Sequence, residues 1–331
     1  MIISKTPYRI SFFGGGTDYP EWYLNNGGQV LATSIDKYSY ITCRHLPPFF
    51  DHRLRLAYSK LEHCMHAKDI KHPSAKAVLM YLGVKKDIEI HHDGDLPARS
   101  GIGSSSTFTV GLFNALSKYL STPITKYNLA KNSINIEQKI IGEHVGSQDQ
   151  ITASYGGFNH IKFKNNGNFI INPINSISKI KIKKLEKKLM LFHTGIFRTA
   201  ENITKKYVNK LYNKANHLNK IHSLVDNAIE ILKSDNIEDF GHLLNETWKI
   251  KREISNNISN NFIDDIYNYT ISNGAIGGKL LGAGGGGFIL FYVPENKQKT
   301  ILKKLSKLVH VPFKFEFLGS QIIYRQKTNK Y

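Results

Sequence analysis

The segment from Leu96 to Thr107, LPARSGIGSSST, constrains the fold and chemistry of this chain more than any other. It lies between a β-like run, Ile88–His92, and a run with helical spacing of apolar residues, Phe108–Leu120. Glycine lets a backbone approach a ligand closely, and the N–H groups at a helix start attract anions. The segment therefore predicts a phosphate-binding loop. A tight turn without a ligand remains the alternative, because Gly/Ser-rich junctions also occur as simple turns.

Length and composition indicate the class of protein. A chain of 331 residues with 41% hydrophobic content is long enough for two domains. It contains no run of about 18 apolar residues, so we expect no transmembrane helix. The first residues, MIISKTPYRISFF, are too polar for a signal peptide. The two cysteines, Cys43 and Cys64, form neither a CxxC pair nor a disulfide framework, and we expect a cytoplasmic protein.

The formal net charge of +19 allows two interpretations. Nucleic-acid binding is one, and it predicts salt-dependent binding of oligonucleotides. However, the lysines are spread among Asn and Ile along the chain instead of forming one arginine-rich tract. We therefore favour a diffuse basic surface that attracts anionic small molecules, with neither a nucleic-acid nor a membrane partner.

Patterning along the chain predicts an α+β protein, because strands and helices do not alternate regularly. The expected strand-like segments are 2–13, 30–35, 38–44, 156–172 and 288–293, and the expected helices are 108–120, 127–141, 200–233 and 239–255. The lysine-rich stretch Lys179–Lys188 marks the expected boundary between a domain of residues 1–178 and one of residues 179–331.

Glu137 stands out on the helix expected over residues 127–141. At about 100° per residue it projects from the middle of an apolar arc. That arc contains Leu129, Ala130, Ile134, Ile136, Ile140 and Ile141. A carboxylate in such a position is rarely buried without a partner. We expect that partner to be a metal ion or a catalytic cation, and a structural ion pair is the alternative.

Three further segments carry polar groups whose roles are ambiguous when each is taken alone. Arg9 lies on a strand-like run and could be a surface residue, and Asp18 follows three glycines and could cap a helix starting at Pro20. Asp149 follows Gly146 and could be a turn residue. The loop GAGGGGF from Gly282 matches GxGxxG only formally, because it leads into a strand instead of opening a helix.

Taken together, these segments resemble the three motifs of the GHMP small-molecule kinases. The motifs are PYRISFFGGGTD, LPARSGIGSSST and KLLGAGGGGF, and they span nearly the whole chain in the family's order. The resemblance implies a two-domain fold, with a ribosomal protein S5 domain 2-like N-terminal domain and a ferredoxin-like C-terminal domain. It also implies ATP and Mg²⁺ as cofactors. The stretches FFGGGTDYPEW, TSIDKYSYITCRHLPPFF, DLPARSGIGSSSTFTVG and HTGIFRTAENI resemble one branch, the D-glycero-D-manno-heptose 7-phosphate kinases.

The resemblance assigns a role to each of these residues. Asp149 and Arg9 would be catalytic, Asp149 facing the substrate hydroxyl, and Ser105 and Glu137 would hold Mg²⁺. The sugar would bind to Gly16, Thr17, Asp18 and Arg198, and the loop from Gly282 to Gly287 would support the phosphate loop. The ATP-binding residues would be Pro97, Arg99, Ser100, Gly101, Ile102, Gly103, Ser104, Ser105 and Ser106. Arg99, Ser100 and Ile102 depart from the usual family residues, but none of these changes removes a backbone donor.

The implied reaction is phosphorylation of the anomeric hydroxyl of a heptose 7-phosphate on the way to nucleotide-activated heptoses. Arg198 or the basic cluster of Arg44, His52 and Arg53 would bind the substrate phosphate, and the sequence does not choose between them. A kinase for galactose, fucose or mannose is the nearest alternative, and a non-kinase family member is another. A homodimer is compatible with the sequence.

Overall fold

The computed structural model describes residues 1–174, 177–196 and 214–326. Its first sheet contains β1(Ile2–Phe13), β2(Gly28–His45), β3(Leu54–Ala57), β4(Leu61–Cys64), β5(Ile88–Gly94), β6(Phe158–Phe163), β7(Phe169–Pro173), β12(Phe315–Glu316) and β13(Gln321–Arg325). The main path runs β13-β1-β2-β5-β3-β4, with β6 and β12 also pairing with β2. Only β3 and β5 pair in parallel among these described strands.

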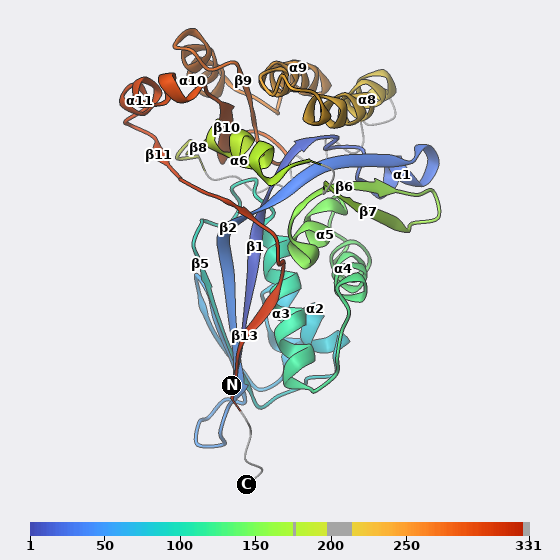
Figure 1. Cartoon of the computed structure of the whole chain (residues 1–331). Coiled ribbons are helices and arrows are strands. Elements are labelled where there is room, and N and C mark those ends of the chain that lie inside the picture. Colours follow the sequence, from blue (N-terminus) through green and yellow to red (C-terminus); the bar gives the residue numbers. More distant parts are fainter. Residues whose placement is uncertain (175–176, 197–213, 327–331) are drawn as a thin grey trace.

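Helices cover one side of this sheet, where α2 to α5 lie beside the long strands β1 and β2 (Figure 1). The helical segments of this half are α1(Pro20–Asn26), η1(Ala67–Asp69), α2(Pro73–Tyr81), α3(Ser104–Tyr119), α4(Lys126–Asn135), η2(Ile136–Ile141) and α5(Gln148–Tyr155). The helix expected over 127–141 is α4 followed by a π-helical turn, η2, which carries Glu137. The strands expected over 30–35 and 38–44 form one continuous strand, β2.

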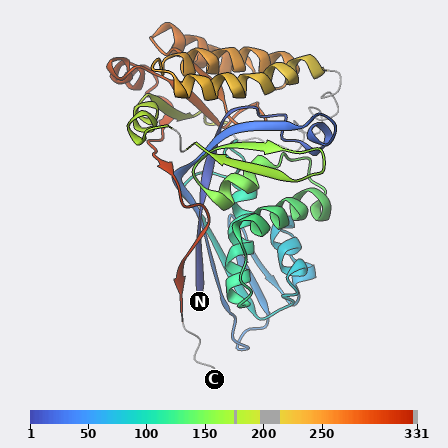
Figure 2. The ribbon, with the colours of Figure 1, turned by 45° about the vertical axis from the view of Figure 1, so that its right-hand side comes forward.

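The second sheet is antiparallel and consists of β8(Leu189–His193), β9(Gly277–Leu280), β10(Phe288–Tyr292) and β11(Val309–His310). Its order, β11-β8-β10-β9, is the 4-1-3-2 order of a ferredoxin-like domain, as expected. Its helices are α6(Lys179–Lys187), α8(Ala215–Lys233), α9(Asp239–Ile254), α10(Asn261–Ser272) and α11(Glu295–Lys304). Figure 2 shows α8 and α9 running side by side above the first sheet.

The two halves share a core. Phe12 and Phe13 of β1 pack edge-on against Phe240 of α9, with ring centroids 5.3 and 5.0 Å apart. Such buried aromatic contacts hold β1 and α9 together across the junction. The chain also returns to the first sheet at its end, because β12 pairs with β2 and β13 with β1. The domain limits 1–178 and 179–331 stay a prediction, and the pairing of β12 and β13 places residues 315–325 with the first sheet.

Candidate active site

The predicted phosphate loop runs into the N-terminus of α3. This helix begins at Ser104, four residues before the expected start, and its N-cap is Gly103 at φ +75°, which supplies no side-chain cap. Thr107 is the first residue whose N–H reaches back to the turn, at 2.9 Å from the Gly103 carbonyl. The N–H groups of the three serines before it therefore have no helical partner. Together with the helix dipole, these N–H groups favour an anion at this end of α3, and phosphate binding here stays a prediction.

A second glycine-rich loop supports the phosphate loop from behind, as expected. The Phe288 N–H donates to the Ser100 carbonyl at 3.1 Å. A Cβ on Gly287 would lie 2.1 Å from the Ser100 carbonyl oxygen, and one on Gly101 would lie 2.5 Å from the Leu281 carbonyl oxygen. Because the two backbones touch, only glycine fits at these positions.

The other predicted ATP-binding residues shape this loop from within. Ser100 donates its hydroxyl to the Pro97 carbonyl at 2.6 Å, and the Arg99 N–H donates to the Ser104 hydroxyl at 3.1 Å. Ile102 is fully buried and anchors the loop, and its carbonyl accepts the Arg9 N–H at 3.2 Å. Contact between these residues and ATP stays a prediction.

Arg9 joins the phosphate loop to Asp149, which lies in the first turn of α5. Arg9 Nε and Nη2 donate to the two oxygens of Asp149 at 2.7 and 2.8 Å, and Nη1 donates to the Gly101 carbonyl at 2.7 Å. The Asp149 side chain is 21% exposed and that of Arg9 only 5%. A Cβ on Gly103 would lie 3.1 Å from Asp149 Oδ2, so this carboxylate lies directly against the phosphate loop. The arrangement places a fixed carboxylate beside the predicted phosphate loop.

Asp18 is buried and contacts Gln148, the neighbour of Asp149 in α5. Its carboxylate accepts the N–H of Gly16 at 2.9 Å and that of Gln148 at 3.4 Å. Burial raises the pKa of Asp18, and the charge of Asp149 raises it further. Asp18 does not cap α1, whose N-cap is Tyr19. Thr17 is fully buried and donates its hydroxyl to carbonyls of its own loop and of β2.

Glu137 is fully buried where η2, α3 and α5 meet. It accepts hydrogen bonds from Thr109 Oγ1 at 2.6 Å and Ser106 Oγ at 2.7 Å, and a third from the Gln150 amide. Burial raises the pKa of Glu137 to about 7, although these donors lower it. The expected burial of Glu137 is confirmed, whereas its partners in the protein are the neutral groups of Thr109, Ser106 and Gln150 and not the structural ion pair that was the alternative. A metal ion as a further partner stays a prediction.

The structure differs from the sequence expectation in which serine faces Glu137. Ser106 contacts the carboxylate, whereas Ser105 is exposed. Consecutive helix residues point about 100° apart, so one position of register decides which hydroxyl reaches η2. Carboxylate and hydroxyl oxygens are the donors that Mg²⁺ prefers, so Glu137 with a neighbouring serine fits this ion. In the described part of the chain, no group of three His, Cys, Asp or Glu side chains is arranged to hold a metal.

Sequence reasoning missed two lysines at the domain junction. Lys251 Nζ on α9 donates to the Gly282 carbonyl at 2.5 Å, and Lys279 Nζ on β9 donates to the Phe12 carbonyl at 2.7 Å. Lys279 opens the third motif, KLLGAGGGGF, and lies in a fully buried strand. A lysine in such a strand was the available signal, because lysine is almost never fully buried without a partner.

The cluster of Arg44, His52 and Arg53 lies far from Asp149. Arg44 Nε donates to Glu89, and Arg53 pairs with Asp87. Cys43 of β2, the neighbour of Arg44, pairs with Ile2 of β1. Arg9 lies seven residues after Ile2 on β1. Seven residues of strand span about 23 Å. This cluster is therefore too distant to bind a phosphate on a sugar held at Asp149. Arg198, the other candidate, lies outside the described residues.

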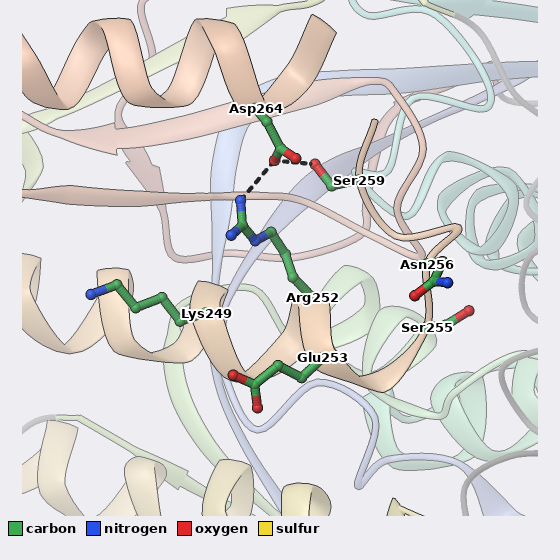
Figure 3. Close-up of a pocket in the computed structure, with 7 residues that line it drawn as sticks. All are labelled: Lys249, Arg252, Glu253, Ser255, Asn256, Ser259 and Asp264. Atoms are coloured by element: carbon green, nitrogen blue, oxygen red, sulfur yellow. Dashed lines mark hydrogen bonds and ion pairs between the residues drawn. The ribbon is translucent and has the colours of Figure 1, made fainter. Parts of the chain in front are cut away.

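Figure 3 shows an open pocket between the end of α9 and the start of α10. Its lining residues are Lys249, Arg252, Glu253, Ser255, Asn256, Ser259 and Asp264. Arg252 and Ser259 both donate to Asp264 within it. The segment that carries the lining residues Asn256 and Ser259 contacts the glycine-rich loop, because Gly285 donates its N–H to the Ile258 carbonyl. Neither Asp149 nor the phosphate loop lines it, so it is not the centre described above.

Comparison with known proteins identifies the class of protein. The family model of the GHMP kinases N terminal domain matches residues 68–157, and that of the GHMP kinases C terminal domain matches residues 228–310. The chain is 33% identical over 322 residues to D-glycero-alpha-D-manno-heptose 7-phosphate kinase of Campylobacter jejuni, covering 92% of this chain and 93% of that protein. The chain therefore belongs to the GHMP kinase family. Within that family it is an ATP-dependent sugar kinase.

Solved structures show the same two-domain fold. A D-glycero-D-manno-heptose 1-phosphate kinase from Bacteroides thetaiotaomicron matches with a TM-score of 0.81 at 23% identity, covering 99% of this chain and all (100%) of the other. A putative sugar kinase from Campylobacter jejuni matches with a TM-score of 0.73 at 28% identity, covering 97% and 98%. The α+β GHMP kinase fold expected from the sequence is thus confirmed. No helix of the described residues is long and apolar enough to span a membrane.

Proposed function

We propose that this kinase transfers the γ-phosphoryl group of ATP to the anomeric hydroxyl of D-glycero-D-manno-heptose 7-phosphate, giving the 1,7-bisphosphate. For the reaction type, the observation that carries the proposal is the contact of the Arg9–Asp149 pair with Gly101 and Gly103 of the phosphate loop. For the substrate, it is the similarity to the Campylobacter jejuni heptose 7-phosphate kinase over most of both chains.

The proposed mechanism depends on positioning more than on a strong base. Phosphoryl transfer passes through a loose transition state with little charge on the attacking oxygen. Asp149, held by two hydrogen bonds from Arg9, orients the C1 hydroxyl and accepts its proton late. The hydroxyl oxygen forms a bond to the γ-phosphorus as the bond to the leaving ADP oxygen breaks. The third Arg9 donor fixes Gly101, which keeps Asp149 and the phosphate loop in register.

We further propose that Glu137 and a serine at the start of α3 hold Mg²⁺, which neutralises phosphate charge when bound. Ser105 is the serine expected from the resemblance, and Ser106 is the one that contacts Glu137. Replacing each by alanine separates the two. We expect the true ligand's variant to raise the Mg²⁺ concentration for half-maximal activity at least about fivefold. The other variant serves as its matched control, and an unchanged metal titration in both would contradict the serine assignment.

Product analysis tests the reaction itself. The protein is incubated with ATP, Mg²⁺ and one of heptose 7-phosphate, heptose 1-phosphate, galactose, fucose or mannose, and ADP release is measured. Phosphorus NMR then locates the new phosphate, and we expect heptose 7-phosphate to give an anomeric phosphate. Faster turnover of a neutral hexose than of heptose 7-phosphate would refute the proposal. Faster turnover of heptose 1-phosphate, with the new phosphate on C7, would refute it as well.

Asp149→Asn tests the assignment of Asp149. The variant keeps the shape of the side chain but removes its charge, so we expect ATP affinity to be retained while kcat falls by roughly 10²-fold or more. Calorimetry with ATP and a coupled ADP assay measure the two quantities. Near-normal turnover would refute the role of Asp149.

A further inference from the structure

Lys251 and Lys279 bring two ammonium groups from the second half of the chain to the site formed by the first. Lys251 donates to Gly282, whose backbone touches Gly101 of the phosphate loop. Lys279 is only 3% exposed and donates to Phe12 of β1, shortly before the loop that carries Asp18. Both ammonium groups therefore donate hydrogen bonds to backbone carbonyls.

The charge around these amines is not balanced. In the parts of the chain that the structure describes, neither lysine forms an ion pair with a carboxylate. Burial lowers the pKa of Lys251 to about 8, and repulsion from Arg9 adds to this effect, which Asp18 partly offsets. Burial also lowers the pKa of Lys279 well below its usual value, with further repulsion from Lys251 and Arg9. A buried site with excess positive charge is stabilised by an anion.

The position of the amines indicates which anion they bind. The triphosphate has its own donors in the N–H groups at the start of α3, near Glu137. Lys279 instead donates to the Phe12 carbonyl at the end of β1, directly before the loop that leads to Asp18. Asp18 and Arg9 are charged neighbours of both lysines. Asp18 is the residue expected to hold the sugar hydroxyls. The amines therefore lie on the side of the site where the acceptor sugar is expected.

We propose that Lys251, with the buried Lys279 beside it, binds the phosphate group that the acceptor sugar already carries, and so selects a phosphorylated sugar over its neutral counterpart. This inference rests on the proposed function, because it needs an acceptor at Asp18 and Asp149. Lys251 is the contacting residue because it is only partly buried as a residue, whereas Lys279 is buried. The bound dianion stabilises the protonated amine, so affinity for the phosphorylated sugar falls as pH rises above about 8.

Lys251→Met tests the proposal, with Lys249→Met as matched control. Lys249 lies two residues away on α9 and is exposed at the outer pocket of Figure 3. The readout is the ratio of kcat/KM for heptose 7-phosphate to kcat/KM for neutral heptose. Loss of a charge-assisted hydrogen bond predicts a fall of this ratio by roughly 10- to 100-fold in the Lys251 variant. The control is expected to keep the wild-type ratio, and an equal loss for both sugars in Lys251→Met would overturn the proposal.

A binding measurement separates this inference from the proposed function. Calorimetry compares mannose 6-phosphate with mannose on the wild-type protein and both lysine variants. If the wild type fails to phosphorylate heptose 7-phosphate, the proposed function is wrong. A preference for binding mannose 6-phosphate over mannose that disappears only in Lys251→Met would still support the role of Lys251. If the wild type binds both hexoses equally, or if the preference survives in Lys251→Met, the role of Lys251 is refuted.

Discussion

Replacing Arg9 by lysine separates the geometry of the guanidinium from its charge. Arg9 makes three side-chain hydrogen bonds, two to the Asp149 carboxylate and one to the Gly101 carbonyl. A lysine amine keeps the positive charge but does not reproduce this planar fork. We therefore expect one carboxylate bond and the bond to Gly101 to be lost or lengthened. Asp149 would then no longer be held against the phosphate loop.

The magnitude follows from the bonds lost. A hydrogen bond to a charged group contributes about 1.5–3 kcal/mol. The Asp149 side chain is 21% exposed, so water replaces part of the lost interaction, and the low end of that range applies. Two such bonds give about 3 kcal/mol of transition-state stabilisation, which corresponds to a decrease of kcat/KM on the order of 100-fold.

The assay is the steady-state release of ADP with heptose 7-phosphate, together with ATP affinity by calorimetry. Arg55→Lys is the matched control, because Arg55 also binds a buried carboxylate, that of Glu89, at 2.9 Å. Arg55 lies on β3 near the far end of the first sheet, and we expect this control to stay within threefold of wild-type kcat/KM. If Arg9→Lys stays within threefold as well, the positioning role of Arg9 is refuted.

Two further changes test the surroundings of the site. A Cβ on Gly146 would lie 1.9 Å from Asp18 Oδ2, so Gly146→Ala displaces that carboxylate. We expect the KM for the sugar to rise at least about tenfold while the KM for ATP stays unchanged. Gly15→Ala is the control, because a Cβ on Gly15 would meet nothing closer than 3.5 Å. The raised pKa of Glu137 means that the folded protein holds this proton more tightly than the unfolded chain, so its contribution to stability is present below about pH 4.5 and is lost as pH rises to about 7. In the metal-free protein, the Tm of Glu137→Gln minus the Tm of wild type is therefore expected to grow as pH rises from about 4.5 to about 7. A difference in Tm that does not vary with pH would contradict the burial argument.

Local patterns in the sequence were enough to predict the elements that carry the phosphate loop and Glu137. The spacing of apolar residues predicted a helix after the loop, and α3 confirms it. The apolar arc around Glu137 predicted a buried carboxylate, because a helical period states which side chains share a face. The resemblance to a family added the order of the three motifs, and with it the two-domain fold.

Contacts between distant segments were decided only by the tertiary structure. Arg9 and Asp149 are 140 residues apart in sequence, and each alone is compatible with a surface role. The register of α3 brings Ser106 to Glu137 and leaves Ser105 exposed. The course of β1 and β2 places Arg44 far from Asp149, and the packing of the second half of the chain on the first brings Lys279 to the Phe12 carbonyl of β1. A sequence period determines the face on which a side chain lies, whereas the group opposite that face depends on how the sheets and helices pack.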